Sequence, residues 1–551
     1  MVKQFVLDLK QEFGRYNAKR LSKDILAGLT VAAVALPLAL AFGVSSGADA
    51  AAGLITAILA GFIISALSGA SYQISGPTGA MTAILIGLVQ KYEMQGVFVV
   101  TLLAGIMLLL ASFFKFGKIV SFIPAPVITG FTSGIAIIIA LGQLDNFFGV
   151  QSQGGDAISK FFSYFNGNFS PNRYAILLGG SVILTMLIWP KKWGTKIPSS
   201  LVGISVATGI SALAKWDVAI VGAIPKTLVA GTRLHLNTIH WGQINDLILP
   251  AISVAALGLI ESLLCGAAAG RMKGEKLNAD RELFAQGIGN ILIPFFGGVP
   301  ATAAIARTSV AIKSGLETRL TGIFHAVGLV LSMFLLGPLM SQIPLSALAG
   351  VLIVTAWRMN EWESIAFIFN KKFKTAIAQF LITMIATVCF DLTIAIVIGV
   401  VFSVLIFMVK ISNIEICASE IKNDKLKEQG LVLQDYHEKA KVLYLTGPIF
   451  FTTTEKISEQ ILGLNELGIL IFSMRGVPLI DTTGVQFLEE MCDSLKQQGT
   501  HVMFAGVQPK VHHMMKRSGF EERLGRKQFF WSVQDALMAL EKKFEPIDKC
   551  S

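Results

Sequence analysis

Charged residues are scarce in this chain of 551 residues: they make up 15% of it, whereas soluble proteins carry about 25%. Hydrophobic residues account for 53% and the mean hydropathy is +0.65, so the composition indicates a membrane protein. The five cysteines form no CxxC pair, which argues against a disulfide framework and against a metal site. A phosphate-binding loop and a nucleophile–base arrangement are also missing. We therefore expect no enzymatic activity, no metal and no cofactor.

Long apolar runs fill the chain between residues 24 and 410. A membrane-spanning helix needs roughly 20 apolar residues, and fewer when it is broken. On this criterion we predict about fourteen transmembrane segments, and we expect no cleavable signal peptide because the first run is long enough to span. The predicted segments are 25–44, 51–67, 77–90, 97–114, 126–144, 174–189 and 201–213 in the first half, and 247–270, 282–296, 302–312, 322–336, 343–356, 376–389 and 392–409 in the second half.

The basic residues predict an orientation in the membrane and no binding of nucleic acid. The formal net charge is +10, and most basic residues lie beside apolar runs, where they set topology. The N-terminal segment 1–23 holds six of them, so we expect it in the cytoplasm. Basic loops then follow even-numbered segments, so we expect the C-terminal tail in the cytoplasm too. We expect the membrane to be a cell inner membrane. These loops are 115–118, 191–196, 271–281, 313–319 and 371–374.

The composition changes after Lys410. Residues 411–434 are polar and charged, which predicts a linker. Three strand-like runs follow and alternate with helical patterns, which predicts a small α/β domain over 435–551. The expected strands are 442–445, 469–472 and 502–505, and the expected helices are 454–463 and 485–498.

Two of the apolar runs are interrupted by a proline among small residues. Pro77 lies 53 residues after Asp24 (77 − 24), and Pro300 lies 54 residues after Asp246 (300 − 246), so two repeats of about 24–214 and 246–410 are matched. Matched broken segments mark the midplane binding site of secondary transporters. A helix start offers N–H groups and about half a positive charge, which suits an anion. Proline kinks with small packing residues are the alternative, but the match between the halves favours a substrate site at Gly76, Thr78, Gly79, Met81, Ala301, Thr302, Ala303 and Ala304.

Two ionisable residues lie in the second repeat. Glu261 falls near the middle of the eighth segment, where an acid costs about 2.5–3.5 kcal/mol and is a functional hypothesis by default. We predict that it takes up a proton and couples it to the anion; a sodium ligand and a hydrogen-bonded structural acid are the alternatives. Arg307 lies in the tenth segment. It could balance Glu261 or raise the potential at the anion site, or it could form a plain salt bridge or extend to the cytoplasmic face.

In the tail, Asp481, Thr482, Thr483 and Gly484 lie between an expected strand and an expected helix. Hydroxyl groups at a helix start are ordinary caps. The same place would hold a phosphate on Thr482 or Thr483, with regulatory consequences. We favour the capping interpretation.

Several of these stretches together resemble the sulfate permease (SulP) family, which includes the prestin-related anion exchangers. The resemblance is carried by residues 35–43, 73–81, 258–264 and 296–308, and residues 479–484 are similar to the STAS domain. It implies an inverted repeat of seven plus seven segments, a core moving against a gate, a homodimer, and an anion site between the third and tenth segments with Arg307 beside it. Cyanobacterial sodium–bicarbonate members carry Asp in place of Glu261 and Thr in place of Cys265, so Glu261 resembles the proton-coupled bacterial members more closely.

These observations predict an α-helical membrane protein with a cytosolic STAS domain, acting as a proton-coupled secondary transporter of a small anion by an elevator-type motion. Sulfate, bicarbonate and a C4-dicarboxylate are the substrates considered. A sodium-coupled bicarbonate transporter, an anion channel and a nucleobase permease of the same fold are the alternatives. Membrane lipid and a cytosolic protein that binds the STAS domain are the further expected partners.

Overall fold

The computed structural model describes most of the chain. The described residues are 2–14, 16–118, 123–152, 157–165, 169–190, 197–224, 227–235, 237, 242, 244–390, 392–412, 414–420, 440–464 and 467–544. Residues 421–434 of the expected linker, and the basic residues of the loop 191–196, lie outside these ranges. The chain divides into two units, residues 1–403 and 404–551, and each is described by itself.

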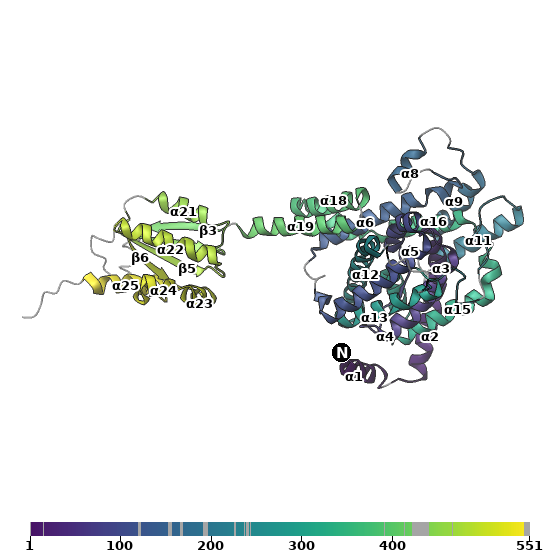
Figure 1. The fold of residues 1–551 in the computed structure, drawn as a ribbon, viewed down its shortest axis with the longest axis horizontal. Helices are drawn as coiled ribbons and strands as arrows, with labels where there is room; N and C mark the ends of the chain where they lie inside the picture. Colours follow the sequence, from purple (N-terminus) through teal and green to yellow (C-terminus); the bar gives the residue numbers. More distant parts are fainter. Residues whose placement is uncertain are drawn as a thin grey trace, which may run out of the picture. The chain divides into compact units, whose positions relative to one another are not determined.

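The first unit is helical (Figure 1). Its first half contains α1 (Val2–Phe13), α2 (Ala18–Ser45), α3 (Ala50–Leu59), the π-helix η1 (Ala60–Ile64), α4 (Ser65–Leu67), β1 (Ser75–Gly76), α5 (Gly79–Phe113), α6 (Ala125–Gly142), α7 (Leu144–Phe148), α8 (Ala157–Ser163), α9 (Arg173–Ile188) and α11 (Ser199–Ala214). Its second half contains α12 (Ile244–Lys273), α13 (Ala279–Leu292), the 3-10 helix η5 (Ile293–Phe296), β2 (Thr302–Ala303), α14 (Ile305–Lys313), α15 (Leu320–Met340), α16 (Leu345–Met359), α17 (Trp362–Asn370) and α18 (Lys374–Cys389). Helix α19 (Leu392–Ile411) runs across the unit boundary.

Six helical stretches are long and apolar enough to cross a membrane, among them α2, α5 and α12. This agrees with the predicted class, while the number of fourteen spans stays a prediction. The expected segments 77–90 and 97–114 are joined in α5, where Glu93 has φ 55° and ψ −176° and breaks the helical path. A left-handed φ at a non-glycine residue is strained, so this break is a defined corner between two helices.

Elements of the two halves pack against each other throughout the first unit. Helix α2 lies against α15, α5 against α12 and α13, and α6 against α18. Each of these pairs joins a helix of the first repeat to one of the second repeat. The interior of the unit is therefore an interface between the two halves, and the broken segments meet there.

The expected helix over 302–312 is wrong at its start. Residues Thr302–Ala303 form β2, and α14 begins only at Ile305. The reason lies far away in the sequence, because Thr302 and Ala303 use their backbone groups to pair with β1. A local apolar pattern contains no information about such a partner.

The N-terminal helix α1 is attached to the start of two later helices. Asp8 pairs with Arg281 of α13, and Glu12 accepts hydrogen bonds from the backbone N–H and from Nε of Arg319, at 2.7 and 2.9 Å. The guanidinium carbons of Arg281 and Arg319 lie 5.1 and 5.4 Å from the ring centre of Phe5. Because both arginines are buried, α1 supplies the negative charges and the aromatic face that they need.

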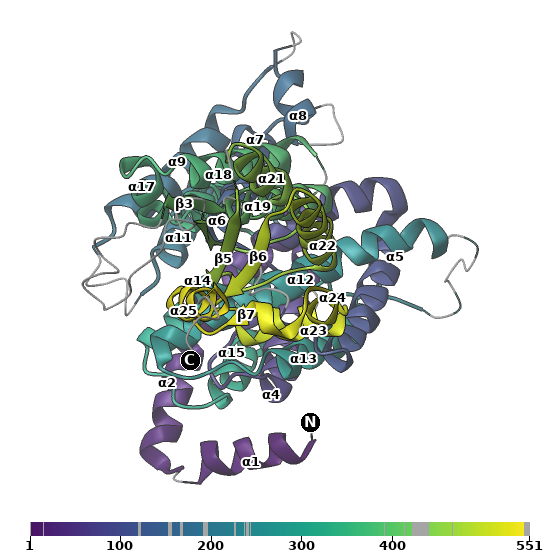
Figure 2. The same cartoon turned by 90° about the vertical axis from the view of Figure 1, so that its left-hand side faces the viewer.

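The second unit is a small α/β domain (Figure 2). Its five strands β3 (Glu415–Glu420), β4 (Ala440–Thr446), β5 (Ile469–Gly476), β6 (His501–Ala505) and β7 (Phe529–Phe530) follow the order of the sequence across the sheet, with β3 antiparallel to β4 and the other pairs parallel. Helix α25 (Val533–Phe544) packs on one face. On the other face lie α21 (Thr454–Leu462), α22 (Thr482–Gln497), α23 (Pro509–Arg517) and α24 (Phe520–Leu524). Alternating side chains of β4, β5 and β6 feed the two cores, as the period-two pattern requires.

Strand β3 corrects the expected linker. Residues Glu415–Glu420 were expected to be part of a connecting segment, but all six pair with β4. Most of their side chains are exposed, since β3 is the edge of the sheet. An edge strand is held mainly by backbone hydrogen bonds, so its sequence carries little hydrophobic signal.

Candidate functional site

The two broken segments meet as a short antiparallel pair. Strand β1 pairs with β2, with Ser75 opposite Ala303 and Gly76 opposite Thr302. Helix α5 begins at Gly79 directly after β1, and α14 begins at Ile305 directly after β2. The structure thus brings together the two groups of small residues that the sequence singled out, although they are more than 220 positions apart.

Polar side chains from neighbouring helices hold the backbone that leads into β2. Asn290 of α13 accepts from the N–H of Ala301 at 2.8 Å and donates to its carbonyl at 2.9 Å. Thr56 of α3 accepts from the N–H of Val299 at 2.7 Å and donates to its carbonyl at 3.0 Å. Both side chains are buried, and each bonds the N–H and the carbonyl of one loop residue, as the backbone of a neighbouring strand would. Sequence reasoning missed them; the available signal was a polar residue inside an apolar run.

Three N–H groups of the second motif already have protein partners. Besides Ala301, the N–H of Ala303 donates to Ser262 Oγ at 3.3 Å and that of Ala304 to the carbonyl of Ile74 at 3.0 Å. The expectation that this stretch itself forms an open helix start is therefore wrong. The first turn of α14 begins one residue later, where Ile305 is 47% exposed.

Hydroxyl and amide groups tie the pair to α12 and α13. Thr302 Oγ1 and Ser262 Oγ are 2.8 Å apart, and Gln73 Nε2 donates to the carbonyl of Ser262 at 2.6 Å. Gln286 Nε2 donates to Ser75 Oγ at 2.8 Å. The β1–β2 pair is thus fixed from both sides, so its position follows the bundle of α5, α12, α13 and α14.

Glu261 reaches the start of α5. Thr78 is the N-cap residue of α5, and its hydroxyl donates to Glu261 Oε2 at 2.9 Å while it accepts from the N–H of Met81 at 3.4 Å. Glu261 is half-buried. The carboxylate of the second repeat is therefore bonded to the helix start of the first repeat, one hydrogen bond away from the expected anion site.

Arg307 lies beneath β1. Its side chain is 1% exposed, and Nη2 donates to the carbonyl of Pro77. A Cβ atom built on Gly76 would lie 3.1 Å from Arg307 Cζ and closer still to Nη1. Nη1 is buried and has no hydrogen-bond partner, and within the described part of the chain Arg307 forms no ion pair. Burying a cation costs free energy when one of its N–H groups lacks an acceptor, and a bound anion would offset that cost.

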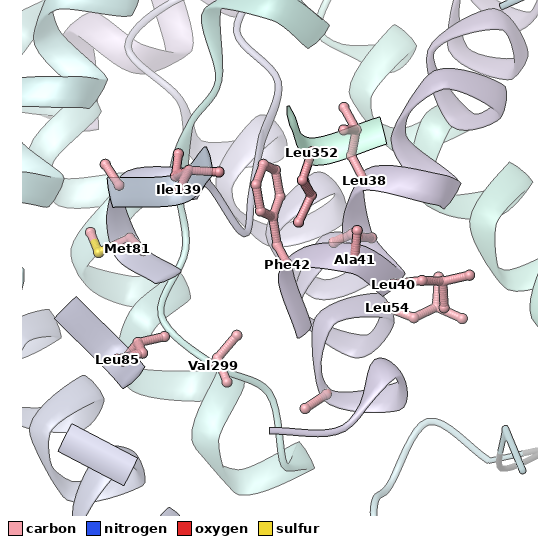
Figure 3. Packing of buried hydrophobic residues seen from close by; sticks show 14 of the residues in the cluster. Leu38, Leu40, Ala41, Phe42, Leu54, Met81, Leu85, Ile139, Val299 and Leu352 are labelled. Carbon is pink, nitrogen blue, oxygen red and sulfur yellow. The ribbon is translucent and has the colours of Figure 1, made fainter. Parts of the chain in front are cut away.

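Apolar side chains cover the start of α5. A Cβ on Gly79 would overlap with Ile139 of α6 and would lie 3.3 Å from the ring of Phe42 on α2. Figure 3 shows the Phe42 ring between Ile139 and Leu352 of α16. These residues, with Thr82, also line a small pocket at the same place. Ile139 and Phe42 therefore lie directly against the first residue of α5 in this conformation.

In the small α/β domain, Asp481 caps α22. Its carboxylate accepts from the N–H of Gly484 at 2.7 Å, while Thr482 and Thr483 are exposed in the first turn. The interpretation that the threonines themselves cap the helix is wrong, because the acid one position earlier takes the N–H group. Both hydroxyls are left accessible at a helix start, where a phosphate group is favoured.

No group of three or more His, Cys, Asp and Glu side chains that could hold a metal ion occurs among the residues with defined positions.

Two family models match this chain, one over the helical unit and one over the C-terminal domain. The model of the sulfate permease family matches residues 21–386, and the model of the STAS domain matches residues 434–536. The chain belongs to the sulfate permease family.

Relatives and solved structures agree with this membership of the sulfate permease family. YvdB of Bacillus subtilis, which is named for sulfate transport, is 32% identical over 534 residues, 94% of this chain and 97% of YvdB. The transmembrane domain of the bicarbonate transporter BicA of a cyanobacterium is 30% identical, with a TM-score of 0.64 over 69% of this chain and 98% of that domain. Murine Slc26a9, an anion transporter in the inward-facing state, has a TM-score of 0.84 at 18% identity over 98% and 95% of the two chains, which concerns the fold alone.

Membership in the sulfate permease family confirms several predictions. The chain is an integral membrane protein, and its C-terminal unit is a STAS domain. The expected absence of enzymatic activity is confirmed by the transport activity for which the family and its members are named. The roles of the individual site residues stay predictions and are developed below.

Proposed function

We propose that this chain is a secondary active transporter of a small anion, and that the anion binds beside the β1–β2 pair. Arg307 carries the proposal, because it is a buried cation whose Nη1 has no hydrogen-bond partner among the described residues. Gly79 and Ala80 are the first two residues of α5, so their N–H groups have no acceptor within the helix. A guanidinium group and a helix start at the same strand pair form an anion site.

Glu261 supports coupling to a proton. Its carboxylate is half-buried and bonded to Thr78, at the start of α5, and no basic side chain forms an ion pair with it among the described residues. An ionised Glu261 would repel an anion at this helix start, whereas the protonated form would not. Binding of a proton and binding of the anion would thus favour each other. A sodium ion held by Glu261 is the alternative form of coupling.

An elevator-type motion fits the position of the apolar cover. Phe42 and Ile139 close the start of α5 in this conformation, and Ile139 belongs to α6, which packs against α16 and α18. The site itself is fixed to α5, α12, α13 and α14 by the bonds described above. A rigid shift of that bundle along α6 and α16 would uncover Gly79 without breaking the β1–β2 pair.

The proposed site recognises the charge of an anion more than its shape. Helix N–H groups and a guanidinium group recognise sulfate, bicarbonate and a C4-dicarboxylate alike. The name of YvdB supports sulfate and that of BicA supports bicarbonate. A homodimer, a cell inner membrane, cytoplasmic termini and a cytosolic partner or phosphorylation of the STAS domain at Thr482 or Thr483 are part of the same proposal.

An uptake panel in proteoliposomes tests the function. Radiolabelled sulfate, bicarbonate, fumarate and succinate are offered with an inward proton gradient, with a sodium gradient, and with neither. We expect concentrative uptake of at least one anion that depends on the proton gradient. Uptake of uracil alone would indicate a nucleobase permease, and currents that need no coupled gradient would indicate a channel; either result contradicts the proposal.

Arg307→Gln tests the site in the same assay. The change keeps hydrogen-bonding capacity but removes the charge, so we expect uptake to fall by at least tenfold at a subsaturating anion concentration. Arg173→Gln is the matched control, because Arg173 is exposed at the start of α9. Equal uptake by Arg307→Gln and the control would place the anion elsewhere.

A further inference from the structure

The hydroxyl of Thr78 has two hydrogen-bond neighbours, one that donates to its oxygen and one that takes its single proton. It accepts from the N–H of Met81 at 3.4 Å and donates to Glu261 at 2.9 Å. A hydroxyl group has one donor proton and two acceptor lone pairs. While Glu261 is a carboxylate, it can only accept, so the Thr78 proton must point toward it. In that state Thr78 has no proton to offer an anion at the start of α5.

Protonation of Glu261 reverses this bond. The carboxyl group then carries a proton that it can donate to Thr78 Oγ1, and the N–H of Met81 already uses the other lone pair. Both acceptor sites of the hydroxyl are then filled by protein donors. Its own proton is then no longer committed to Glu261, and Thr78 is the N-cap residue directly before Gly79 and Ala80 of α5.

We propose that Thr78 is a proton-controlled switch, which donates to Glu261 when that residue is ionised and to the transported anion when Glu261 is protonated. This inference rests on the proposed function. One proton from solvent forms an O–H bond with the Glu261 carboxylate, and this bond breaks when the proton leaves on the other side of the membrane; no other covalent bond changes. The same proton removes a negative charge and supplies a hydrogen-bond donor, so the two effects act together on the anion.

The other charged and titratable groups described on α5, α12, α13 and α14 have contacts of their own or lie further along their helices. From α14, Arg307 acts on Glu261 through space, and on α12 Cys265 lies one turn further and donates to Thr308 at 3.6 Å. From α13, Glu282 is bonded to Ser68 and Gln286 instead. On α5 itself, Lys91 and Glu93 lie more than three turns beyond Thr78. The direct contact between Thr78 and Glu261 therefore distinguishes this hydroxyl from the rest.

Thr78→Val and Thr78→Ser test the switch. Valine keeps the shape and removes the hydroxyl, while serine keeps the hydroxyl. The control is Thr101→Val, because Thr101 is a buried threonine of the same helix that donates only to the carbonyl of Val97, at 2.7 Å. The measurement is the dissociation constant of radiolabelled sulfate at pH 5.5 and pH 8 without a gradient, or of fumarate if the panel shows no sulfate uptake.

The expected result concerns the pH dependence of binding. Wild type, Thr78→Ser and Thr101→Val should bind the anion about tenfold or more tightly at the lower pH, as expected for one hydrogen bond to a charged group. Thr78→Val should lose most of this difference and bind weakly at both values. If the dissociation constants of Thr78→Val at the two pH values differ by as much as those of wild type, the switch is wrong. If that variant does not fold, Thr78→Ala, which also lacks the hydroxyl, decides in the same way.

Glu261→Gln separates this inference from the proposed function. A permanently neutral side chain should make binding independent of pH. If Glu261→Gln keeps the wild-type pH dependence, coupling through Glu261 fails and the switch fails with it. If Glu261→Gln is independent of pH while Thr78→Val keeps the full wild-type difference, proton coupling stands and the switch alone is wrong.

Discussion

Gly76→Ala should destabilise the protein because Arg307 fills the space in which the new methyl group would lie. An ideal Cβ at position 76 would be 3.1 Å from Arg307 Cζ and 3.3 Å from Nη2, and closer still to Nη1. Atoms this close must separate, and β1 cannot give way, because it is paired with β2. The guanidinium group must therefore move away from the carbonyl of Pro77.

The magnitude follows from two costs. Forcing one carbon into a packed site costs about 1–3 kcal/mol, and losing a hydrogen bond from a charged donor costs about 1.5–3 kcal/mol. Together they lower the free energy of unfolding by about 2.5–6 kcal/mol. For a cooperative unit of 403 residues, this lowers the melting temperature by roughly 3–7 °C.

The assay is thermal unfolding of the purified protein in detergent, with two further variants. Gly87→Ala is the matched control in α5, because a Cβ there meets no atom within 4 Å and alanine favours helix. Arg307→Lys removes the planar fork, so adding Gly76→Ala to it should cost at least about 1 kcal/mol less than in wild type. The reasoning is refuted if Gly76→Ala has the same melting temperature as wild type. It is also refuted if Gly76→Ala lowers the free energy of unfolding equally in wild type and in Arg307→Lys.

Two further predictions concern regions away from the site. Glu12→Gln leaves the buried Arg319 without its carboxylate, so we expect a loss of about 1–3 kcal/mol in the same thermal assay, and a melting temperature equal to wild type would contradict the contact between α1 and α15. In the STAS domain, burial raises the pKa of the Cys492 thiol to about 12, above the usual value of about 8.5, so this thiol should react far more slowly with maleimide at pH 8 than the exposed Cys417. Because its folded pKa is raised, Cys492 should stabilise the domain fully below about pH 8.5 and lose that contribution as the pH rises toward 12; equal labelling of Cys492 and Cys417 would show that the site is open.

The meeting of the two broken segments could be predicted from the sequence because each carries its own local signal. Pro77 and Pro300 interrupt apolar runs at matched positions, and a matched interruption implies a shared site. The strand register could not be predicted, because nothing near Thr302 indicates that its backbone pairs with Gly76.

Single polar residues inside helices were also beyond sequence reasoning. Asn290 and Thr56 hold the loop before β2 by bonding to its backbone N–H and carbonyl groups. In the sequence, however, each is only one polar residue in an apolar run. Such a residue can bond to its own helix, to a neighbouring helix or to a ligand. Only the arrangement of α3 and α13 around that loop decides between these uses.

The contacts of Glu261 and Arg307 explain why the two broken segments must move together. Both charged residues come from the second repeat, yet each is bonded to the first repeat, Glu261 to Thr78 and Arg307 to the carbonyl of Pro77. If the two halves slid past each other at this point, both bonds would break and a buried cation would lose its partner, at a cost of several kcal/mol. If Glu261 and Arg307 instead formed an ion pair with each other, an arriving anion would have to break that pair. Glu261 is bonded to Thr78 and Arg307 to the neighbouring residue Pro77, so the two charges have different partners at the end of β1. In the proposed elevator-type motion, β1, β2 and both charged residues would therefore move as one body, and the sliding surface would lie where Ile139 meets Gly79 and Phe42 at the start of α5.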